Sequence, residues 1–325
     1  MLYPFKFKTI FKDKIWGGEK IKTVLGKDFS PLPNCGETWE ISGVPGNVSL
    51  VANGLLQDKS LNELIETYKG ELLGEAVYQK FGKDFPLLIK FIDANEDLSI
   101  QVHPDDVLAK QRHNSFGKTE MWYIFQSDKD SSLIVGFNKD TDKKEYLESL
   151  ENGKLMSILN RETAKAGDCY FIPAGRVHTI GKGLLLAEIQ QTSDVTYRIY
   201  DFDRTDDKGQ KRELHTEESV DSLDYKAYPQ YKTPYTEELN KTAPLVSCQY
   251  FTTNLLSFDK PIVKDYSDKK SFVIYICFEG KAILETPNGK FEIKMGDSYL
   301  IPYSVKNISL KPVGLTKILE VYIEL

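Results

Sequence analysis

The sequence has few cysteines and no long apolar run, and both absences exclude classes of protein. Its four cysteines are widely separated and form no CxxC pair, so we expect reduced thiols in a cytoplasmic protein, with neither disulfides nor a thiolate metal site. No window of about 18 uncharged apolar residues occurs, so we expect no membrane span. The opening segment MLYPFKFKTIFKDKIWGG mixes lysines with aromatic residues and lacks the apolar core of a signal peptide.

An excess of positive charge is also absent. The formal net charge of -6 disfavours a general affinity for nucleic acid backbones or anionic lipids. A hydrophobic content of 41% with 28% charged residues is ordinary for a soluble globular protein, and a length of 325 residues suggests about two domains. We therefore expect neither nucleic acid nor a membrane as a partner.

Signals for helices are few and fall in three segments. KSLNELIETYKG has Ser60 and Glu63 at capping-box spacing, followed by apolar residues at helical period. HPDDVLAKQRH has Pro104 and two aspartates where a short helix would begin, and DTDKKEYLESLENGKLMSIL predicts one or two helices broken near Gly153. Elsewhere, short runs such as LLIKFID, MWYIF, FVIYICF and KILEVYIEL recur between turn residues. This spacing favours a β-sandwich or barrel over alternating strands and helices.

A weak internal repeat indicates two related β-modules. AGDCYFIPAGRVHTI and MGDSYLIPYSVKNIS align without a gap, and EMWYIF can be laid over FVIYIC. We place the modules at residues 1–235 and 236–325, joined through a polar, tyrosine-rich stretch around residues 205–245. In this overlay His178 falls on Asn307 and Glu120 falls on Phe272. Because the repeat keeps the scaffold residues and exchanges these polar ones, we interpret Glu120 and His178 as functional residues of the first module.

The stretch DLSIQVHPDD places Gln101 and His103 two positions apart in a short run of β-type residues. Residues two apart on a strand share one face of the sheet, so the two side chains point the same way. Strand geometry alone leaves two interpretations open. The pair either faces a common ligand or forms the solvated face of an ordinary strand.

The pattern G-x5-P-x-G-x2-H at Gly167, Pro173, Gly175 and His178 resembles the second motif of the cupin superfamily. A strand ends at Ile172, the Pro-Ala-Gly segment turns the chain, and the histidine is expected on the next strand, pointing into the barrel. Cupins are small jelly rolls that hold a metal through imidazoles and a carboxylate. The first cupin motif is usually His-x-His followed by a glutamate, and Gln101-Val102-His103 and Glu120 stand in these places.

Several ordered motifs together resemble the type I mannose-6-phosphate isomerase family, the zinc-dependent cupins, in its shorter bacterial form. They are LSIQVHPDD, GKTEMWYIF, IPAGRVHTI and EIQQTSDVTYRIYDFDR, with FKDKIWGGEKI and GETWEIS nearer the N-terminus. The resemblance is strong from residue 1 to about 205 and weaker beyond. It implies a mainly β fold of two cupin modules with a few inserted helices, in an enzyme that interconverts mannose 6-phosphate and fructose 6-phosphate through an enediol.

The resemblance also implies a metal site with one Zn2+ per chain. The implied ligands are Gln101, His103, Glu120 and His178. Neutral imidazoles and a carboxylate suit zinc, and a ligand set with room for water leaves a coordination position open for catalysis. The second module lacks this pattern, so we expect no metal there and a role in packing or assembly.

Further roles follow from the same resemblance. Arg198 in TYRIY matches a functional arginine at the barrel mouth, as a catalytic group or phosphate clamp, although a strand arginine can also extend to solvent. Lys118 is a candidate for proton transfer or charge stabilisation. Lys90, Glu188 and Asp194 match substrate-binding positions, and Asp194 also fits a simple turn residue. The remaining histidines, His113 and His215, lie in polar segments and are expected to be solvated.

One position departs from the family pattern. The residue before Lys118 is usually a histidine in longer family members and is Gly117 here, so water, His113 or another group must carry any proton that this histidine would move. The general base and the oligomeric state therefore stay open. Two rival functions also stay open, namely another metal-dependent cupin enzyme such as an iron oxygenase, and a catalytically silent protein that binds sugar phosphates.

Overall fold

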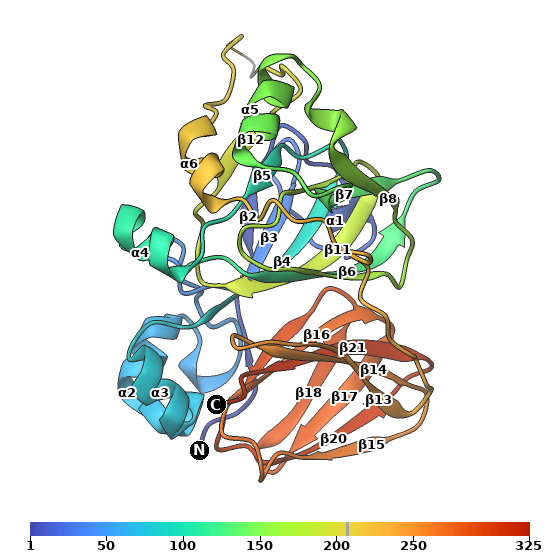
Figure 1. Ribbon diagram of the computed structural model, residues 1–325. Coiled ribbons are helices and arrows are strands. Elements are labelled where there is room, and N and C mark those ends of the chain that lie inside the picture. Colours follow the sequence, from blue (N-terminus) through green and yellow to red (C-terminus); the bar gives the residue numbers. More distant parts are fainter. Residues whose placement is uncertain (206–207) are drawn as a thin grey trace.

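The computed structural model describes residues 1–205 and 208–325, and its elements form two modules of β-sheet (Figure 1). The first module contains the strands β2 (Ile10–Lys12), β3 (Glu37–Ile41), β4 (Leu87–Ala94), β5 (Ile100–Val102), β6 (Glu120–Ser127), β7 (Ser132–Phe137), β8 (Leu159–Thr163), β9 (Cys169–Ile172), β10 (His178–Ile180), β11 (Leu184–Gln191) and β12 (Tyr197–Tyr200). The second contains β1 (Phe5–Lys6), β13 (Lys241–Ser247), β14 (Thr252–Phe258), β15 (Ile262–Asp265), β16 (Val273–Glu279), β17 (Lys281–Thr286), β18 (Gly289–Lys294), β19 (Ser298–Ile301), β20 (Asn307–Pro312) and β21 (Thr316–Tyr322). The prediction of a mainly β fold with cupin modules is confirmed.

Six helices and two short 3-10 turns are inserted between these strands in the described residues. They are α1 (Lys20–Thr23), α2 (Leu61–Leu73), α3 (Glu75–Phe81), α4 (Asp106–His113), α5 (Lys143–Glu151), α6 (Thr216–Ser222), η1 (Gly54–Leu56) and η2 (Leu155–Ser157). The three predicted helical segments are confirmed as α2, α4 and α5, the last followed by η2. Ser60 and Glu63 form the predicted capping box at the start of α2. The sequence pattern missed α1, α3 and α6, which are short and carry few buried apolar residues.

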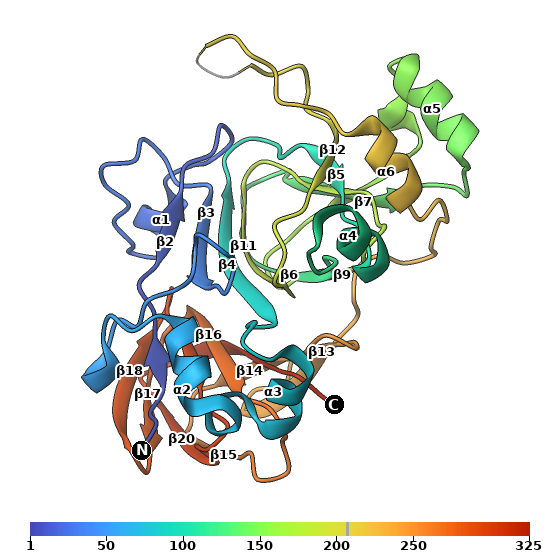
Figure 2. The ribbon, with the colours of Figure 1, turned by 90° about the vertical axis from the view of Figure 1, so that its left-hand side faces the viewer.

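The four sheets stack as layers. In the first module a six-stranded sheet, β2-β3-β4-β11-β6-β9, faces a five-stranded sheet, β12-β5-β10-β7-β8, and in the second β1-β19-β16-β21-β14-β13 faces β15-β20-β17-β18. The two six-stranded sheets share one hydrophobic core, in which Tyr123 and Ala187 of the first module join Ile274 and Leu319 of the second. Figure 2 shows α2 and α3 beside the second module. The modules therefore bury a common apolar layer.

Strand registers establish which residues of the two modules correspond, and they correct the overlay made from sequence. Glu120 pairs with Ile172, and Val273 pairs with Ile301, the repeat counterpart of Ile172. The counterpart of Glu120 is therefore Val273, and the overlay on Phe272 was wrong by one residue. A shift of one residue moves a strand side chain to the opposite face of its sheet, and Phe272 accordingly lies in the core shared by the modules.

The corrected register shows that both modules have a buried carboxylate at the equivalent position. Glu188 lies opposite Lys90 and Trp122 in the first module, while Glu320 lies opposite Asn254 and Tyr275 in the second. Both carboxylates are almost fully buried. In the described residues, no helix is long and apolar enough to cross a membrane.

Candidate active site and metal centre

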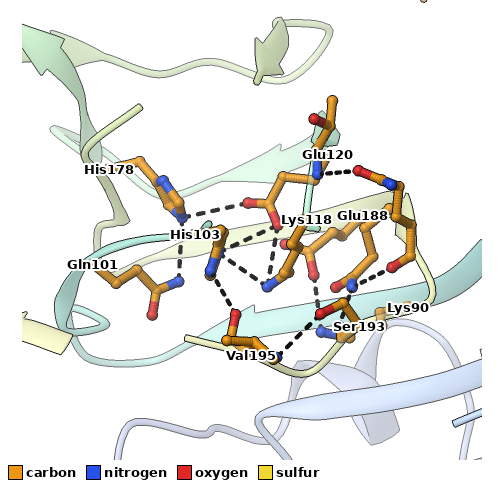
Figure 3. A network of polar contacts seen from close by, with 12 residues as sticks. Lys90, Gln101, His103, Lys118, Glu120, His178, Glu188, Ser193 and Val195 are labelled. Atoms are coloured by element: carbon orange, nitrogen blue, oxygen red, sulfur yellow. Dashed lines mark hydrogen bonds and ion pairs between the residues drawn. The ribbon is translucent and has the colours of Figure 1, made fainter. Parts of the chain in front are cut away.

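Three metal-ligating side chains converge inside the first module. His178 begins β10, Glu120 begins β6, and His103 lies just beyond the end of β5. One ligand atom from each of the three lies within 4.8 Å of the others, and all three side chains are buried. Figure 3 shows the two imidazoles and the carboxylate pointing toward one another. The Pro-Ala-Gly turn after β9 places His178 as the sequence predicted.

The tautomers of both histidines are fixed by backbone carbonyls. His103 Nδ1 lies 3.0 Å from the carbonyl oxygen of Val195, and His178 Nδ1 lies 2.8 Å from that of Arg176. A carbonyl can only accept, so each Nδ1 carries a proton and each Nε2 presents a lone pair to the centre. Burial lowers the pKa of His178 to about 4 and that of His103 well below its usual value. Both imidazoles are therefore neutral at pH 7, as metal ligation requires.

Glu120 completes the cluster with two oxygens that lack hydrogen bonds. Oε1 lies 3.4 Å from His178 Nε2 and Oε2 lies 3.6 Å from His103 Nε2. Neither oxygen accepts a hydrogen bond from the described residues, although the side chain is fully buried. Burial and the charge of Glu188 raise the pKa of Glu120 to about 7. Buried polar atoms are normally satisfied, so the unsatisfied carboxylate and the two imidazoles form a cluster that could hold a metal ion.

Gln101 and Lys118 border the same cluster. The Gln101 amide lies 3.3 Å from His178 Nε2, and a half-turn of the amide would present its oxygen at this position. Lys118 Nζ lies 3.0 Å from His103 Nε2 and 3.2 Å from Glu120 Oε2. Both residues also line a cavity of about 290 Å³. Gln101 and Lys118 therefore connect the cluster with the cavity.

The wall of this cavity carries a row of alternating charges. Lys90 Nζ lies 3.0 Å from Glu188 Oε1 and 4.0 Å from Glu37 Oε2. Burial alone would lower the pKa of Lys90, but the two carboxylates outweigh burial and raise it. The lysine in turn outweighs burial of Glu37 and holds its pKa at about 2. These groups are ionised at neutral pH.

Two arginines also line the cavity. The Arg198 guanidinium lines it, donates to the carbonyl oxygen of Glu213 at 2.8 Å, and has a buried Nε without a hydrogen bond partner in the described residues. Arg212 also lines the cavity and is held by Asp201 through hydrogen bonds of 2.8 and 2.5 Å. Asp201 is shared with Arg204. One carboxylate therefore serves two guanidinium groups, and Arg198 has no ion-pair partner among the described residues.

The residues singled out from the sequence therefore meet in one place. Lys90, Gln101, Lys118, Glu188, Asp194 and Arg198 line the cavity, while His103, Glu120 and His178 lie behind Gln101 and Lys118, in contact with them. His113 is exposed as expected. His215 is half-buried, and its Nδ1 accepts a hydrogen bond from the backbone N–H of Arg198 at 3.1 Å, so the expectation of a solvated histidine was wrong for this residue.

Comparison with known proteins identifies the fold and the family. Residues 4–154 match the model of the phosphomannose isomerase type I catalytic domain, and residues 241–323 match that of the mannose-6-phosphate isomerase cupin domain. The mannose-6-phosphate isomerase ManA of Bacillus subtilis is 37% identical, over 95% of this chain and 96% of its own length. That of Streptococcus mutans is 35% identical, over 94% and 95%. The chain belongs to the type I phosphomannose isomerase family.

Solved structures agree with this assignment. The crystal structure of mannose 6-phosphate isomerase from Bacillus subtilis superposes with a TM-score of 0.88 at 33% identity, covering 98% of this chain and 99% of that one. A variant of phosphomannose isomerase from Salmonella typhimurium shares the fold alone, with a TM-score of 0.80 at 17% identity over 99% of this chain and all of the other. As a member of this family the chain is an enzyme of the isomerase class.

Several cavity residues were missed by reasoning from the sequence. Lys14, Trp16, Glu37 and Trp39 line the cavity. They lie within FKDKIWGGEKI and GETWEIS, two segments that resemble the isomerase family, so the signal was present without an assigned role. Arg212 was missed for a different reason. It lies in the polar stretch after residue 205, where the resemblance is weaker.

The departure at Gly117 has a steric cause. A Cβ built on this residue would lie 2.5 Å from the backbone nitrogen of Asp106 and 2.6 Å from the carbonyl carbon of Asp105. Real Cβ atoms do not approach backbone so closely. The start of α4 thus occupies the space that any side chain at this position would need, and no residue-117 side chain can carry a proton in this enzyme.

Proposed function

We propose that the enzyme interconverts mannose 6-phosphate and fructose 6-phosphate with one zinc ion per chain. The observation that carries this proposal is the Glu120 carboxylate, which is buried without hydrogen bonds, faces the lone pairs of two neutral imidazoles, and lies beside Lys118, which lines a cavity with several cations. His103, Glu120, His178 and the amide oxygen of Gln101 are the proposed ligands. Nitrogen and oxygen donors in such a set suit zinc with a position left for substrate or water.

The second part of the proposal concerns the substrate phosphate. A phosphate monoester carries about -1.5 to -2 charges at pH 7 and is bound well by arginine forks. Arg198 and Arg212 line the cavity with guanidinium groups that no carboxylate fully neutralises. We assign these two side chains to the phosphate, which favours a sugar phosphate over an uncharged sugar. An oxygenase acting on a neutral substrate would leave them without a role.

The third part concerns the reaction. Aldose–ketose isomerisation moves a proton between C1 and C2 through an enediol, with negative charge developing on the sugar oxygens. Bound zinc would supply a Lewis acid next to those oxygens. Lys118 lines the cavity beside the ligands, and we assign its ammonium group to stabilising the same charge. Lys90, Glu37 and Glu188 orient the sugar hydroxyls, since an ionised row of this kind offers both donors and acceptors.

A matched pair of substitutions tests the metal site. His178→Ala removes a proposed ligand, whereas Asn307→Ala alters its exposed counterpart in the second module. We expect His178→Ala to lose zinc and isomerase rate together, by at least about a hundredfold in rate, while Asn307→Ala keeps both. Zinc is measured by elemental analysis and rate by a coupled assay of fructose 6-phosphate formation. The proposal would be refuted if the zinc-loaded wild type had no isomerase activity, or if His178→Ala kept the zinc content and the rate of the wild type.

A further inference from the structure

The segment that carries both Lys118 and Glu120 is held in place mainly by side chains of other elements. The backbone N–H of Gly117 donates to Asp106 Oδ1 at 2.9 Å, and that of Thr119 donates to Gln191 Oε1 at 2.9 Å. The N–H of Lys118 between them donates to the carbonyl oxygen of Pro104 at 3.0 Å. Each N–H ahead of Glu120 therefore has one defined acceptor.

Asp106 and Gln191 belong to one hydrogen-bonded network. Gln191 Nε2 donates to Asp106 Oδ1 at 2.9 Å, so this oxygen accepts both from Gln191 and from Gly117. The second carboxylate oxygen, Asp106 Oδ2, accepts from the hydroxyl of Tyr250 at 2.7 Å. Asp106 begins α4, and a carboxylate is favoured at a helix N-terminus. The carboxylate thus joins the lysine segment, defined as residues 117–120, to Tyr250.

Tyr250 belongs to the second module. It lies in the turn between β13 and β14, directly before Phe251, which is fully buried in the core shared by the two modules. The buried neighbour therefore anchors the backbone of Tyr250 and positions its hydroxyl. Through its hydrogen bond to Asp106, Tyr250 connects the second module to the network around the lysine segment.

Hydrogen bonds add orientation to a segment that is already buried. Residues 117–120 are buried, and Gly117 packs against the start of α4. Lys118 lines the cavity of about 290 Å³, while the acceptor residues Asp106 and Gln191 and the donor Tyr250 line a separate groove of about 1050 Å³. The N–H groups of Gly117 and Thr119 both end on this network, so its directional hydrogen bonds set the orientation of the segment between the cavity and the groove.

We propose that Tyr250 and Asp106 are positioning residues through which the second module fixes Lys118 and Glu120 for the isomerase reaction. Without the Tyr250 hydroxyl, Asp106 Oδ2 faces the groove and the carboxylate can rotate away from Gly117. Lys118 then samples positions away from the sugar oxygens, and misplacement of a catalytic group lowers the rate of the chemical step. This inference rests on the proposed function and gives the second module a role in catalysis.

The test compares Tyr250→Phe, Asp106→Ala and the double variant with Tyr228→Phe in the full, zinc-loaded chain. Tyr228 is a matched control because its hydroxyl also donates to a carboxylate, Asp224, at 2.7 Å, on the exposed surface. We expect Tyr250→Phe to lower kcat about fivefold, the effect of one lost hydrogen bond, with KM and zinc content unchanged. We expect Asp106→Ala to lower kcat further, and Tyr250→Phe to add nothing in that background. The control keeps wild-type kcat.

Amide hydrogen exchange gives a readout that does not depend on activity. We expect faster exchange at residues 117–119 in Tyr250→Phe and in Asp106→Ala, and wild-type exchange there in Tyr228→Phe. Unchanged kcat and exchange in Tyr250→Phe, or additive effects in the double variant, would overturn the inference. An inactive zinc-loaded wild type would instead refute the proposed function, and the exchange rates would still decide whether Tyr250 fixes the segment.

Discussion

Two buried glutamates in the first module, Glu120 and Glu188, differ in how well their charges are compensated. Glu120 has no hydrogen bond from the described residues and is compensated mainly by Lys118, whose Nζ lies 3.2 Å from Oε2, while Glu188 accepts from Lys90 at 3.0 Å and from the Trp122 indole at 2.9 Å. A buried carboxylate with unsatisfied oxygens costs free energy, whereas breaking a buried ion pair leaves an uncompensated charge. Burial is therefore a poor guide to which of the two carboxylates stabilises the protein.

Replacing each glutamate with glutamine tests how each carboxylate affects the stability of the protein. Glu120→Gln removes a carboxylate with unsatisfied oxygens but also removes the partner of Lys118, and because these effects oppose one another we expect the stability of the metal-free protein to change by no more than about 1 kcal/mol, with the proposed zinc affinity lost. Glu188→Gln leaves Lys90 buried without its main partner, and we expect a loss of about 3–5 kcal/mol. Urea unfolding in the presence of a chelator measures both. Equal destabilisation by the two substitutions would contradict this account.

Arg212 provides a second test at the level of one residue. If its guanidinium binds the substrate phosphate, Arg212→Ala should raise KM for fructose 6-phosphate about tenfold to a hundredfold, the range for a charged hydrogen bond, with a smaller change in kcat. Arg161→Ala, an exposed arginine that donates to Ser132 Oγ, is the control. A KM within twofold of wild type would remove Arg212 from the phosphate site.

At the level of elements, helix α4 explains why residue 117 is a glycine here, where longer family members usually have a histidine. Its first residue and its N-cap, Asp106 and Asp105, approach Gly117 so closely that no Cβ fits. The N-cap carboxylate of Asp105 accepts from the N–H of Leu108 at 2.9 Å, which holds the helix start in place. The start of α4 therefore requires a glycine next to Lys118.

Gly117→Ala tests this constraint. The new methyl group must displace the start of α4 or the lysine segment, so we expect a loss of about 1–3 kcal/mol in unfolding free energy and a lower kcat. Ser115→Ala, two residues away, should change neither by a comparable amount. Chemical denaturation and the coupled assay report the two effects. Wild-type stability in Gly117→Ala would mean that the helix start yields easily.

Across the whole molecule, the two modules depend on one another. The two six-stranded sheets share a single core, and β1 from the start of the chain pairs with β19 of the second module. The second module also holds its own buried network, in which Glu320 accepts from Asn254 at 2.8 Å and pairs with Lys264 at 2.8 Å. Glu320 occupies the position that Glu188 has in the first module, where Glu188 also has polar partners but lines a cavity.

A truncated chain tests this dependence. A fragment of residues 236–325 lacks β1 and exposes the apolar face that Tyr123 and Ala187 cover, so we expect it to aggregate or remain unfolded. The full chain should unfold in one cooperative transition, with coincident fluorescence and circular dichroism curves. A fragment with dispersed, native-like NMR signals would show that the modules are independent.

Much of the fold could be predicted from local patterns. Runs of Val, Ile, Tyr and Phe gave β4, β6, β11, β16 and β21, and the capping box gave α2, because these features depend on neighbours in the sequence. The sequence pattern did not predict short helices such as α3 and α6, since the stability of such helices comes from tertiary packing. The overlay of Glu120 on Phe272 failed because only strand pairing determines which face a residue occupies.

By itself, the sequence determined which side chains to look for, since Gln101, His103, Glu120 and His178 all stand in its motifs and lie together in the structure. Tertiary structure alone decided the rest. It set the tautomers of the histidines, brought Arg212 to the cavity and linked Tyr250 to the lysine segment. The reason is physical: these features depend on directional contacts between residues far apart in the chain, and no local pattern encodes such contacts.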